Sequence, residues 1–317
     1  MRVLRTWPAV VLVSLGCGSN SVPNTTGSGG QGGTAGTGGS PSEADCWSAS
    51  LDAWELAPFD MSRLAGGEPR DPMLSQDGLT LYYSAFAESG IPRIYETSRI
   101  SRDLGFDGGT NVAEWLGQNP LGHPWRVGEE LFMAEDNNLG VFHVVVSTFD
   151  GSSWSLPEPP GASINEGVSN GDPTLTGDGR RIVFTRHPVE ETPVRLAEGA
   201  RSDPAPGTPF STFSDVVIPG IAPENFVVCP ALSQDGRMLF FSTVDLASGD
   251  FALVWVTERK SLDQPWEAPV HIAAFDVPRQ HTCVHVLSFD GCEVWLERFT
   301  LEMTGDGYAI AKRSPIP

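Results

Sequence analysis

The chain has 317 residues and a formal net charge of -20 at pH 7, because 40 Asp and Glu outweigh 20 Lys and Arg. Nucleic-acid binding needs clusters of basic side chains that neutralise phosphates, so this composition argues against a nucleic-acid partner. Acidity of this kind is typical of a solvated surface that keeps a protein soluble.

The N-terminal segment has the layout of an export signal. Arg2 and Arg5 precede an apolar run from Trp7 to Leu15, and Cys17 follows at the expected cut site. The run is well short of the roughly 20 residues that a membrane-spanning helix needs. The segment resembles a lipoprotein signal, which implies lipid attachment at Cys17. Since Gly18 is not the Asp of inner-membrane lipoproteins, the resemblance implies an outer-membrane or cell-surface location. An ordinary signal peptide, leaving a periplasmic or secreted soluble protein, is the alternative.

A stretch rich in Gly, Ser and Thr follows Cys17 and has GSGGQGGTAGTGGS at its centre. Such a stretch buries no apolar surface and behaves as a flexible coil. Its position suits a tether that holds a folded domain away from a membrane surface. We therefore expect a signal segment over residues 1–17, a disordered tether over residues 18–44 and one folded domain over residues 45–317.

One motif recurs along the folded domain. The clearest copies are DPMLSQDGLTLYYS from Asp71, DPTLTGDGRRIVFT from Asp172 and CPALSQDGRMLFFS from Cys229. A degenerate copy, LGHPWRVGEELFMA, begins at Leu121, and a terminal copy, VHVLSFDGCEVWLE, begins at Val284. Repeats of this length that hold several short strands are typical of β-propeller blades.

A turn stands at the centre of each copy. Asp-Gly between two β-prone runs predicts a hairpin, because Gly accepts the positive φ of the turn and Asp can hydrogen-bond the local backbone. The turns are Asp77-Gly78, Asp178-Gly179, Asp235-Gly236 and Asp290-Gly291, with Val127-Gly128 in the degenerate copy.

Each hairpin is followed by a third strand and then by a turn-rich element with an aromatic residue, such as Trp154 or Trp266, beside Pro and small residues. Four strands per repeat make one blade. The last copy ends at Pro317 before any fourth element, whereas residues 48–61 match that element. We therefore expect an all-β propeller of five blades with four antiparallel strands each, in which the N-terminal strand closes the last blade. Six blades are the alternative.

The pattern D-P-x-L-S-x-D-G-x-x-L-Y-F-x-S, with the strand and aromatic element after it, resembles the WD40-like repeat of TolB-type proteins and bacterial envelope lipoproteins. The resemblance covers residues 48–317 and implies the fold, since the shared residues form turns and core. We expect a monomeric, non-enzymatic envelope lipoprotein without cofactors, whose propeller is a binding or interaction scaffold for a protein or glycan partner. The alternative is a carbohydrate-binding or glycoside-hydrolase-like five-bladed propeller that uses the tunnel mouth.

Four cysteines remain besides Cys17, and an exported protein with an even set is expected to form two disulfides. Three pairings are possible. Cys229 and Cys283 lie near the starts of neighbouring innermost strands, and Cys46 and Cys292 lie at one loop end of the closing blade. We therefore expect the bonds Cys229–Cys283 and Cys46–Cys292.

Asp71 and Asp172 are the candidate catalytic residues, because they open equivalent innermost strands and should point into the tunnel. Five-bladed propellers include glycoside hydrolases that place three carboxylates there, two of which serve as acid and as base or nucleophile. A third carboxylate here would have to come from Glu68 or Glu224. The Asp-Pro pair is also a structural feature of the repeat, in which the Asp caps a backbone turn. We expect this structural role.

A third pattern concerns a metal. His281, Cys283 and His285 alternate along a strand and so share one face. Imidazole and thiolate suit Zn or Cu. Because the expected disulfide takes the Cys283 sulfur, we expect no metal.

Overall fold

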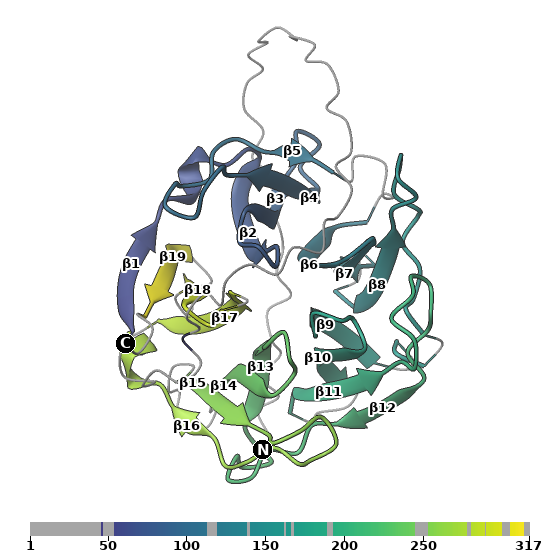
Figure 1. The fold of residues 1–317 in the computed structure, drawn as a ribbon, viewed down its shortest axis with the longest axis vertical. Coiled ribbons are helices and arrows are strands. Elements are labelled where there is room, and N and C mark those ends of the chain that lie inside the picture. Colours follow the sequence, from purple (N-terminus) through teal and green to yellow (C-terminus); the bar gives the residue numbers. More distant parts are fainter. Residues whose placement is uncertain are drawn as a thin grey trace, which may run out of the picture. The chain divides into compact units, whose positions relative to one another are not determined.

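The computed structural model describes residues 46, 54–112, 119–137, 140–161, 163–165, 168–188, 193–244, 253–277, 280–288, 290–299 and 305–313. These residues form five antiparallel sheets that follow one another around a ring (Figure 1). Two 3-10 helices, η1 (Met61–Arg63) and η2 (Ala273–Phe275), join strands. The five-bladed all-β propeller expected from the repeats is confirmed. Within the described ranges, no helix is long and apolar enough to cross a bilayer.

Each blade is named by its order in the chain. Blade 1 contains β2 (Gly67–Leu74), β3 (Thr80–Phe86), β4 (Pro92–Ser98) and β5 (Thr110–Asn111). Blade 2 contains β6 (Leu121–Val127), β7 (Glu130–Asp136) and β8 (Phe142–Thr148). Blade 3 contains β9 (Val168–Leu175), β10 (Arg181–Pro188), β11 (Arg195–Ala200) and β12 (Thr212–Asp215). Blade 4 contains β13 (Phe226–Leu232), β14 (Met238–Val244), β15 (Leu253–Glu258) and β16 (Val270–His271). Blade 5 contains β17 (His281–Leu287), β18 (Glu293–Phe299), β19 (Gly305–Lys312) and β1 (Glu55–Phe59).

The Asp-Gly turns are held by one local network. In blade 1, Asp77 accepts hydrogen bonds from the Ser75 hydroxyl at 2.5 Å and from the Leu79 amide at 2.9 Å. Gly78 has a φ of 71°, the left-handed region that favours glycine. The turn aspartates of blades 3, 4 and 5 accept the same pair of bonds, at Asp178, Asp235 and Asp290. These residues therefore shape the hairpins.

A repeated arginine ties each of these turns to the outer part of its blade. The Nε of Arg99 donates to the carbonyl of Gly78 at 2.9 Å, and its guanidinium lies 4.6 Å from the ring centroid of Phe106. The equivalent pairs are Arg201 with Phe210, Arg259 with Trp266 and Arg313 with Trp54. Trp266 is thus a buried packing residue of the blade.

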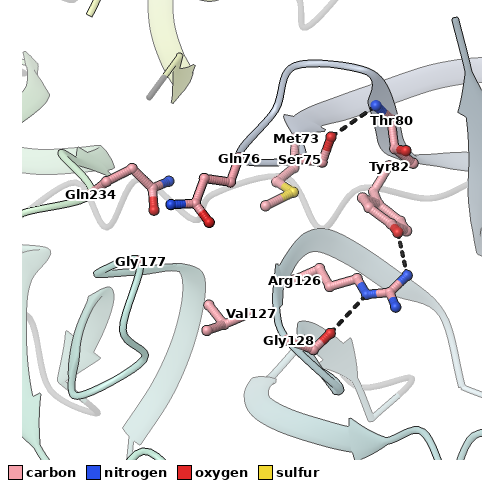
Figure 2. Close-up of a pocket in the computed structure, with 10 residues that line it drawn as sticks. All are labelled: Met73, Ser75, Gln76, Thr80, Tyr82, Arg126, Val127, Gly128, Gly177 and Gln234. Carbon is pink, nitrogen blue, oxygen red and sulfur yellow. Dashed lines mark hydrogen bonds between the residues drawn. The ribbon is translucent and has the colours of Figure 1, made fainter. Parts of the chain in front are cut away.

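Blade 2 departs from this plan. Its turn has Val127 and Gly128 in place of Asp-Gly (Figure 2). Phe149 occupies the position of the repeated arginine, with its amide bonded to Glu129 in the equivalent register. Its ring packs 5.2 Å from that of Trp154. Among the described residues, the expected fourth strand is reduced to two isolated bridges, between Val146 and Glu158 and between Phe149 and Trp154.

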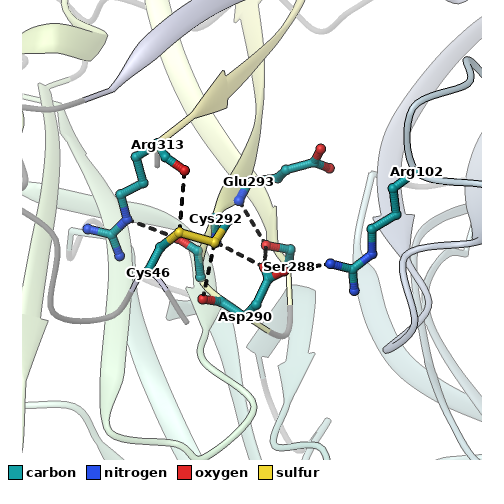
Figure 3. The surroundings of a disulfide bond; sticks show 8 residues. Cys46, Arg102, Ser288, Asp290, Cys292, Glu293 and Arg313 are labelled. Carbon is teal, nitrogen blue, oxygen red and sulfur yellow. Dashed lines mark hydrogen bonds and ion pairs between the residues drawn. A yellow bond between two sulfur atoms is a disulfide. The ribbon is translucent and has the colours of Figure 1, made fainter. Parts of the chain in front are cut away.

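The N-terminal strand closes the ring, as expected. β1 pairs with β19 in antiparallel register from Glu55 opposite Lys312 to Phe59 opposite Tyr308. Cys46 is bonded to Cys292 (Figure 3), across a sequence separation of 246 residues. The second disulfide joins Cys229 to Cys283, so both expected pairings are confirmed. Two disulfides indicate an oxidising compartment outside the cytoplasm.

Blade 5 also contacts blade 1 through side chains. Arg102 forms an ion pair with Asp290 at 2.5 Å, next to the Cys46–Cys292 bond (Figure 3). The core between the two blades contains Trp295, which is fully buried and packs with its ring centroid 6.0 Å from that of Phe106. Burial of such a side chain stabilises the fold by about 1.5–3 kcal/mol. The interface therefore combines apolar packing with ion pairing.

Candidate active site at the centre of the ring

The innermost strands all contain a bulge at the same position. In blade 1 the pairing register shifts between Arg70 and Met73, and the other four blades shift at the equivalent place. The first bulge residue in blades 1 to 4 has a positive φ, at Asp71 (51°), His123 (48°), Asp172 (49°) and Cys229 (54°). A non-glycine residue held there costs about 1–3 kcal/mol, and such strain is typical of functional sites.

Proline follows each of these four residues, and it suits a bulge because its missing N–H removes no ladder hydrogen bond. Blade 5 has the single bulge residue His285. The imidazole of His285 stacks on that of His123, with ring centroids 6.2 Å apart. Since blade 1 lies between blades 5 and 2 in the ring, this contact places the bulge side chains across the central tunnel (Figure 1).

His123 links the two predicted aspartates. Its Nδ1 lies 3.0 Å from Oδ1 of Asp172 and 3.4 Å from Oδ1 of Asp71. The second oxygen of Asp71 accepts a 2.6 Å bond from the Ser84 hydroxyl and a 3.2 Å bond from the His123 amide. Thr185 donates to Asp172 in the same way, at 2.7 Å. The two carboxylates are therefore fixed on either side of one imidazole nitrogen.

A third carboxylate lies beside this group. Glu297 of β18 accepts a 3.0 Å hydrogen bond from the Tyr308 hydroxyl and lies 2.8 Å from Nε2 of His285. Burial and the negative charge of Glu297 raise the pKa of Tyr308, so the phenol stays neutral. Tyr308 therefore acts as a hydrogen-bond donor that orients Glu297.

The charges of the group reinforce one another. Burial acts to raise the pKa of Asp71, but the neighbouring His123 and His285 and the bonds from Ser84 and the His123 amide outweigh it, so the pKa is lowered. Burial acts to lower the pKa of His123, but the nearby carboxylates, Asp172 first, outweigh it and the pKa is raised. The two shifts therefore favour the ionised form of Asp71 and the protonated form of His123 relative to the free side chains.

The cluster remains accessible. The His123 side chain is 32% exposed and that of Asp172 is 23% exposed. Within the described residues, nothing bonds to Nε2 of His123. A solute that reaches the ring centre can therefore meet an imidazole N–H and carboxylate oxygens together.

The same residues offer a metal-ligand set. One ligand atom from each of Asp71, His123 and His285 lies within 4.8 Å of the others, and imidazole with carboxylate suits several divalent transition metals. The candidate set named from the sequence, which was expected to hold no metal, was different and comprised His281, Cys283 and His285. Cys283 is bonded to Cys229, so its sulfur is not a free thiolate. His281 is buried, and burial lowers its pKa.

The structure brings together Asp71, Asp172 and His285, but the sequence interpretation missed their partners. Glu68 and Glu224 are exposed, with Glu68 paired to Arg70 at the surface. The third carboxylate is Glu297 instead. One pattern in the sequence could have identified His123, because His-Pro in the degenerate copy aligns with Asp-Pro in its neighbours. No sequence pattern identified Glu297, because it lies in a second strand and enters the site through its register opposite Cys283.

No known protein family model matches the sequence, and no match was found among curated proteins. Solved structures do match. An endo-arabinase from Bacteroides thetaiotaomicron aligns with a TM-score of 0.53 and 13% identity over 82% of this chain and 98% of its own. The catalytic domain of a GH62 α-L-arabinofuranosidase from Coprinopsis cinerea gives 0.53 and 13% over 83% and 97%. TolB from Acinetobacter baumannii gives 0.40 and 16% over 65% and 46%. The likeness establishes the fold alone.

The comparisons correct two expectations, namely that the protein is an interaction scaffold and that it is not an enzyme. The sequence favoured a non-enzymatic interaction scaffold, but solved structures that match with a TM-score of 0.50 or more include an endo-arabinase, α-L-arabinofuranosidases and a family-43 glycoside hydrolase. The expectation of a non-enzymatic scaffold is therefore withdrawn. The resemblance to TolB was read from turn and core residues, which specify a propeller and carry no information on activity.

Proposed function

We propose that the protein is a carbohydrate-active propeller that hydrolyses a glycosidic bond at the ring centre. The observation that carries this proposal is the position of His123 Nδ1 between carboxylate oxygens of Asp71 and Asp172, with Glu297 beside them. Glycoside hydrolysis requires an acid for the leaving oxygen and a base or nucleophile for the opposite face of the sugar. This site holds an acidic and a basic group within one network.

Asp71 is the proposed base. Its lowered pKa keeps it ionised, and the bonds from Ser84 and the His123 amide fix one oxygen and leave Oδ1 toward the imidazole. An ionised carboxylate can take a proton from a water that attacks the anomeric carbon. A positioned base of this kind contributes a rate factor of about 10²–10⁴.

His123 is the proposed acid. Its raised pKa favours the protonated imidazole, and Asp172, the nearer carboxylate, holds the proton on Nδ1. The Nε2–H is then available to protonate the leaving oxygen. Asp172 acts through His123 and is a positioning residue, as a carboxylate commonly is for a catalytic imidazole. The proton that Asp71 gains and the proton that His123 loses balance over one hydrolysis.

The test is hydrolysis of neutral aryl glycosides by the purified domain. It begins with arabinofuranosides and xylosides, because the titles of matching solved structures name an endo-arabinase, an α-L-arabinofuranosidase and a GH62 hydrolase in complex with xylotriose. Asp71→Asn should lower kcat by about 10²–10⁴-fold. Asp263→Asn is the matched control, since that side chain is 90% exposed. Absence of hydrolysis across the panel, or full activity of Asp71→Asn, would refute the proposal.

We also propose lipid attachment at Cys17, which places the propeller at the outer membrane or cell surface. Residues 1–45 lie outside the described part of the chain, so the support comes from the apolar run and the Gly-rich stretch around Cys17. The two disulfides of the propeller agree with an exported protein. A surface location would bring the ring centre to glycans outside the cell.

A further inference from the structure

The hairpin turn of blade 2 is two residues shorter than its equivalents. Val127 pairs with Glu130 directly across Gly128 and Glu129. In blade 1, the equivalent Ser75 bonds to Thr80 across four intervening residues, from Gln76 to Leu79. The shortened turn lies beside a space that residues from the turns of blades 1, 3 and 4 also line.

A cavity of about 290 Å³ occupies this space (Figure 2). Four blades line it. The lining includes Met73 and Gln76 from blade 1, Arg126 and Val127 from blade 2, Gly177 from blade 3 and Gln234 from blade 4. The volume is at the low end of the range for small-molecule sites. It therefore suits a ligand about as large as one sugar ring.

The cavity has its own polar groups. The Gln76 and Gln234 amides face each other (Figure 2), and neither forms a hydrogen bond with the described residues. Arg126 donates from Nε to the carbonyl of Gly128 at 3.0 Å and from Nη1 to the Tyr82 hydroxyl. Its guanidinium also lies 5.3 Å from the ring centroid of Trp154. In the other blades the equivalent aromatic contacts the repeated arginine, which blade 2 lacks. The guanidinium is thus held in place, and its side chain is 30% exposed.

The charges around the cavity disfavour charged ligands. An aspartate directly follows the lining residue in each of three turns, at Asp77, Asp178 and Asp235. These carboxylates repel an anion, as does the strongly negative chain. A cation would meet Arg126 inside the cavity. A neutral ligand that both donates and accepts hydrogen bonds matches the two amides best.

We propose that this cavity binds a neutral sugar ring. The amides and Arg126 would bond its hydroxyls, and Met73 and Val127 would contact its apolar face. The site is separate from the catalytic one, because the two share no residue. Asp71 bonds to Ser84, which pairs with Arg70, whereas the cavity begins further along the strand, at Met73 opposite Tyr82. The inference therefore does not rest on the proposed hydrolysis.

Calorimetric titration with glucose, galactose, xylose and arabinose tests the site, with glucuronate and glucosamine as charged counterparts. We expect one neutral sugar to bind once per chain with a Kd of about 1 mM, and both charged sugars to bind at least about tenfold more weakly. Val127→Trp, which fills the cavity, should abolish binding. The pair Gln76→Ala and Gln234→Ala should weaken it at least about tenfold without reshaping the turn of blade 2.

Gln264→Ala is the matched control, since Gln264 is exposed in another loop of blade 4. Asp71→Asn should keep the binding while losing hydrolysis, which separates this inference from the proposed function. The inference is overturned if none of the four neutral sugars binds, if glucuronate binds more tightly, or if the double glutamine variant binds like the parent. Loss of binding in Gln264→Ala would also overturn it.

Discussion

The guanidinium of Arg313 lies 4.4 Å from the ring centroid of Trp54, while its Nε donates a 3.0 Å hydrogen bond to the carbonyl of Gly291. Trp54 precedes β1, and Arg313 follows β19 at the other end of the chain. The pair therefore joins the N-terminal segment to the last turn of blade 5. A cation–π contact of this kind contributes about 0.5–2 kcal/mol beyond apolar burial.

Removal of this contact should loosen the whole ring. We expect Trp54→Ala to lower the free energy of unfolding by about 3–5 kcal/mol, because it removes a buried indole that covers Arg313. Urea denaturation followed by circular dichroism gives the value. Leu156→Ala, at a side chain that is 68% exposed, should change it by less than about 0.5 kcal/mol. Equal effects of the two substitutions would contradict the role of Trp54 in closure.

The buried ion pair between Arg201 and Glu130 offers a second test. Their atoms lie 2.5 Å apart, with side chains 1% and 3% exposed, and they join blades 3 and 2. Glu130→Ala leaves a buried guanidinium without its partner, so we expect a loss of about 3–5 kcal/mol in unfolding free energy. The exposed pair Arg63 and Asp107 is the control, and Asp107→Ala should cost about 0–1 kcal/mol.

The pH dependence of hydrolysis should identify the two proposed catalytic groups. Activity should fall as pH drops through the lowered pKa of Asp71, below its ordinary value of 3.8. It should fall again as pH rises through the raised pKa of His123, above its ordinary 6.5. Asp172→Asn removes the main charge that raises the His123 pKa, so the alkaline limb of kcat/KM should move to lower pH. An unchanged alkaline limb in that variant would remove His123 from the acid role.

Attachment of lipid at Cys17 is tested by fractionation. Cys17→Ser should move the protein from the membrane fraction to the soluble fraction of the envelope, because the acyl chains that hold it are lost. The control is the double variant Cys229→Ser and Cys283→Ser, which removes the Cys229–Cys283 disulfide, leaves the signal segment intact and should stay in the membrane fraction. The lipid proposal fails if the Cys17→Ser protein stays with the membrane.

The sequence predicted the blades because hairpins are local. Asp77 with Gly78, or Asp178 with Gly179, marks a turn within a few residues, and regular spacing then implies the ring. The match of residues 48–61 to a fourth element also predicted closure, since that element has its own aromatic residue, Trp54.

The ring centre was less predictable because it is made by contacts between blades. Asp71 and Asp172 could be named from their repeat position. Their connection through His123 depends on a bulge that turns the side chain inward, and bulges leave little trace in a hydrophobic pattern. Glu297 comes from a second strand and reaches the site through its pairing opposite Cys283, a register that the repeat motif does not reveal.

Blade 2 has a consequence for the design of related proteins. Consensus engineering stabilises repeat proteins by replacing the atypical unit with the average one. Here such a replacement would restore Asp-Gly at Val127, lengthen the turn and exchange His123 for aspartate. The resulting ring would be more regular, but three aspartates would adjoin with no imidazole between them and the cavity would be filled. Irregularity in this one unit is therefore a feature that an engineer should preserve.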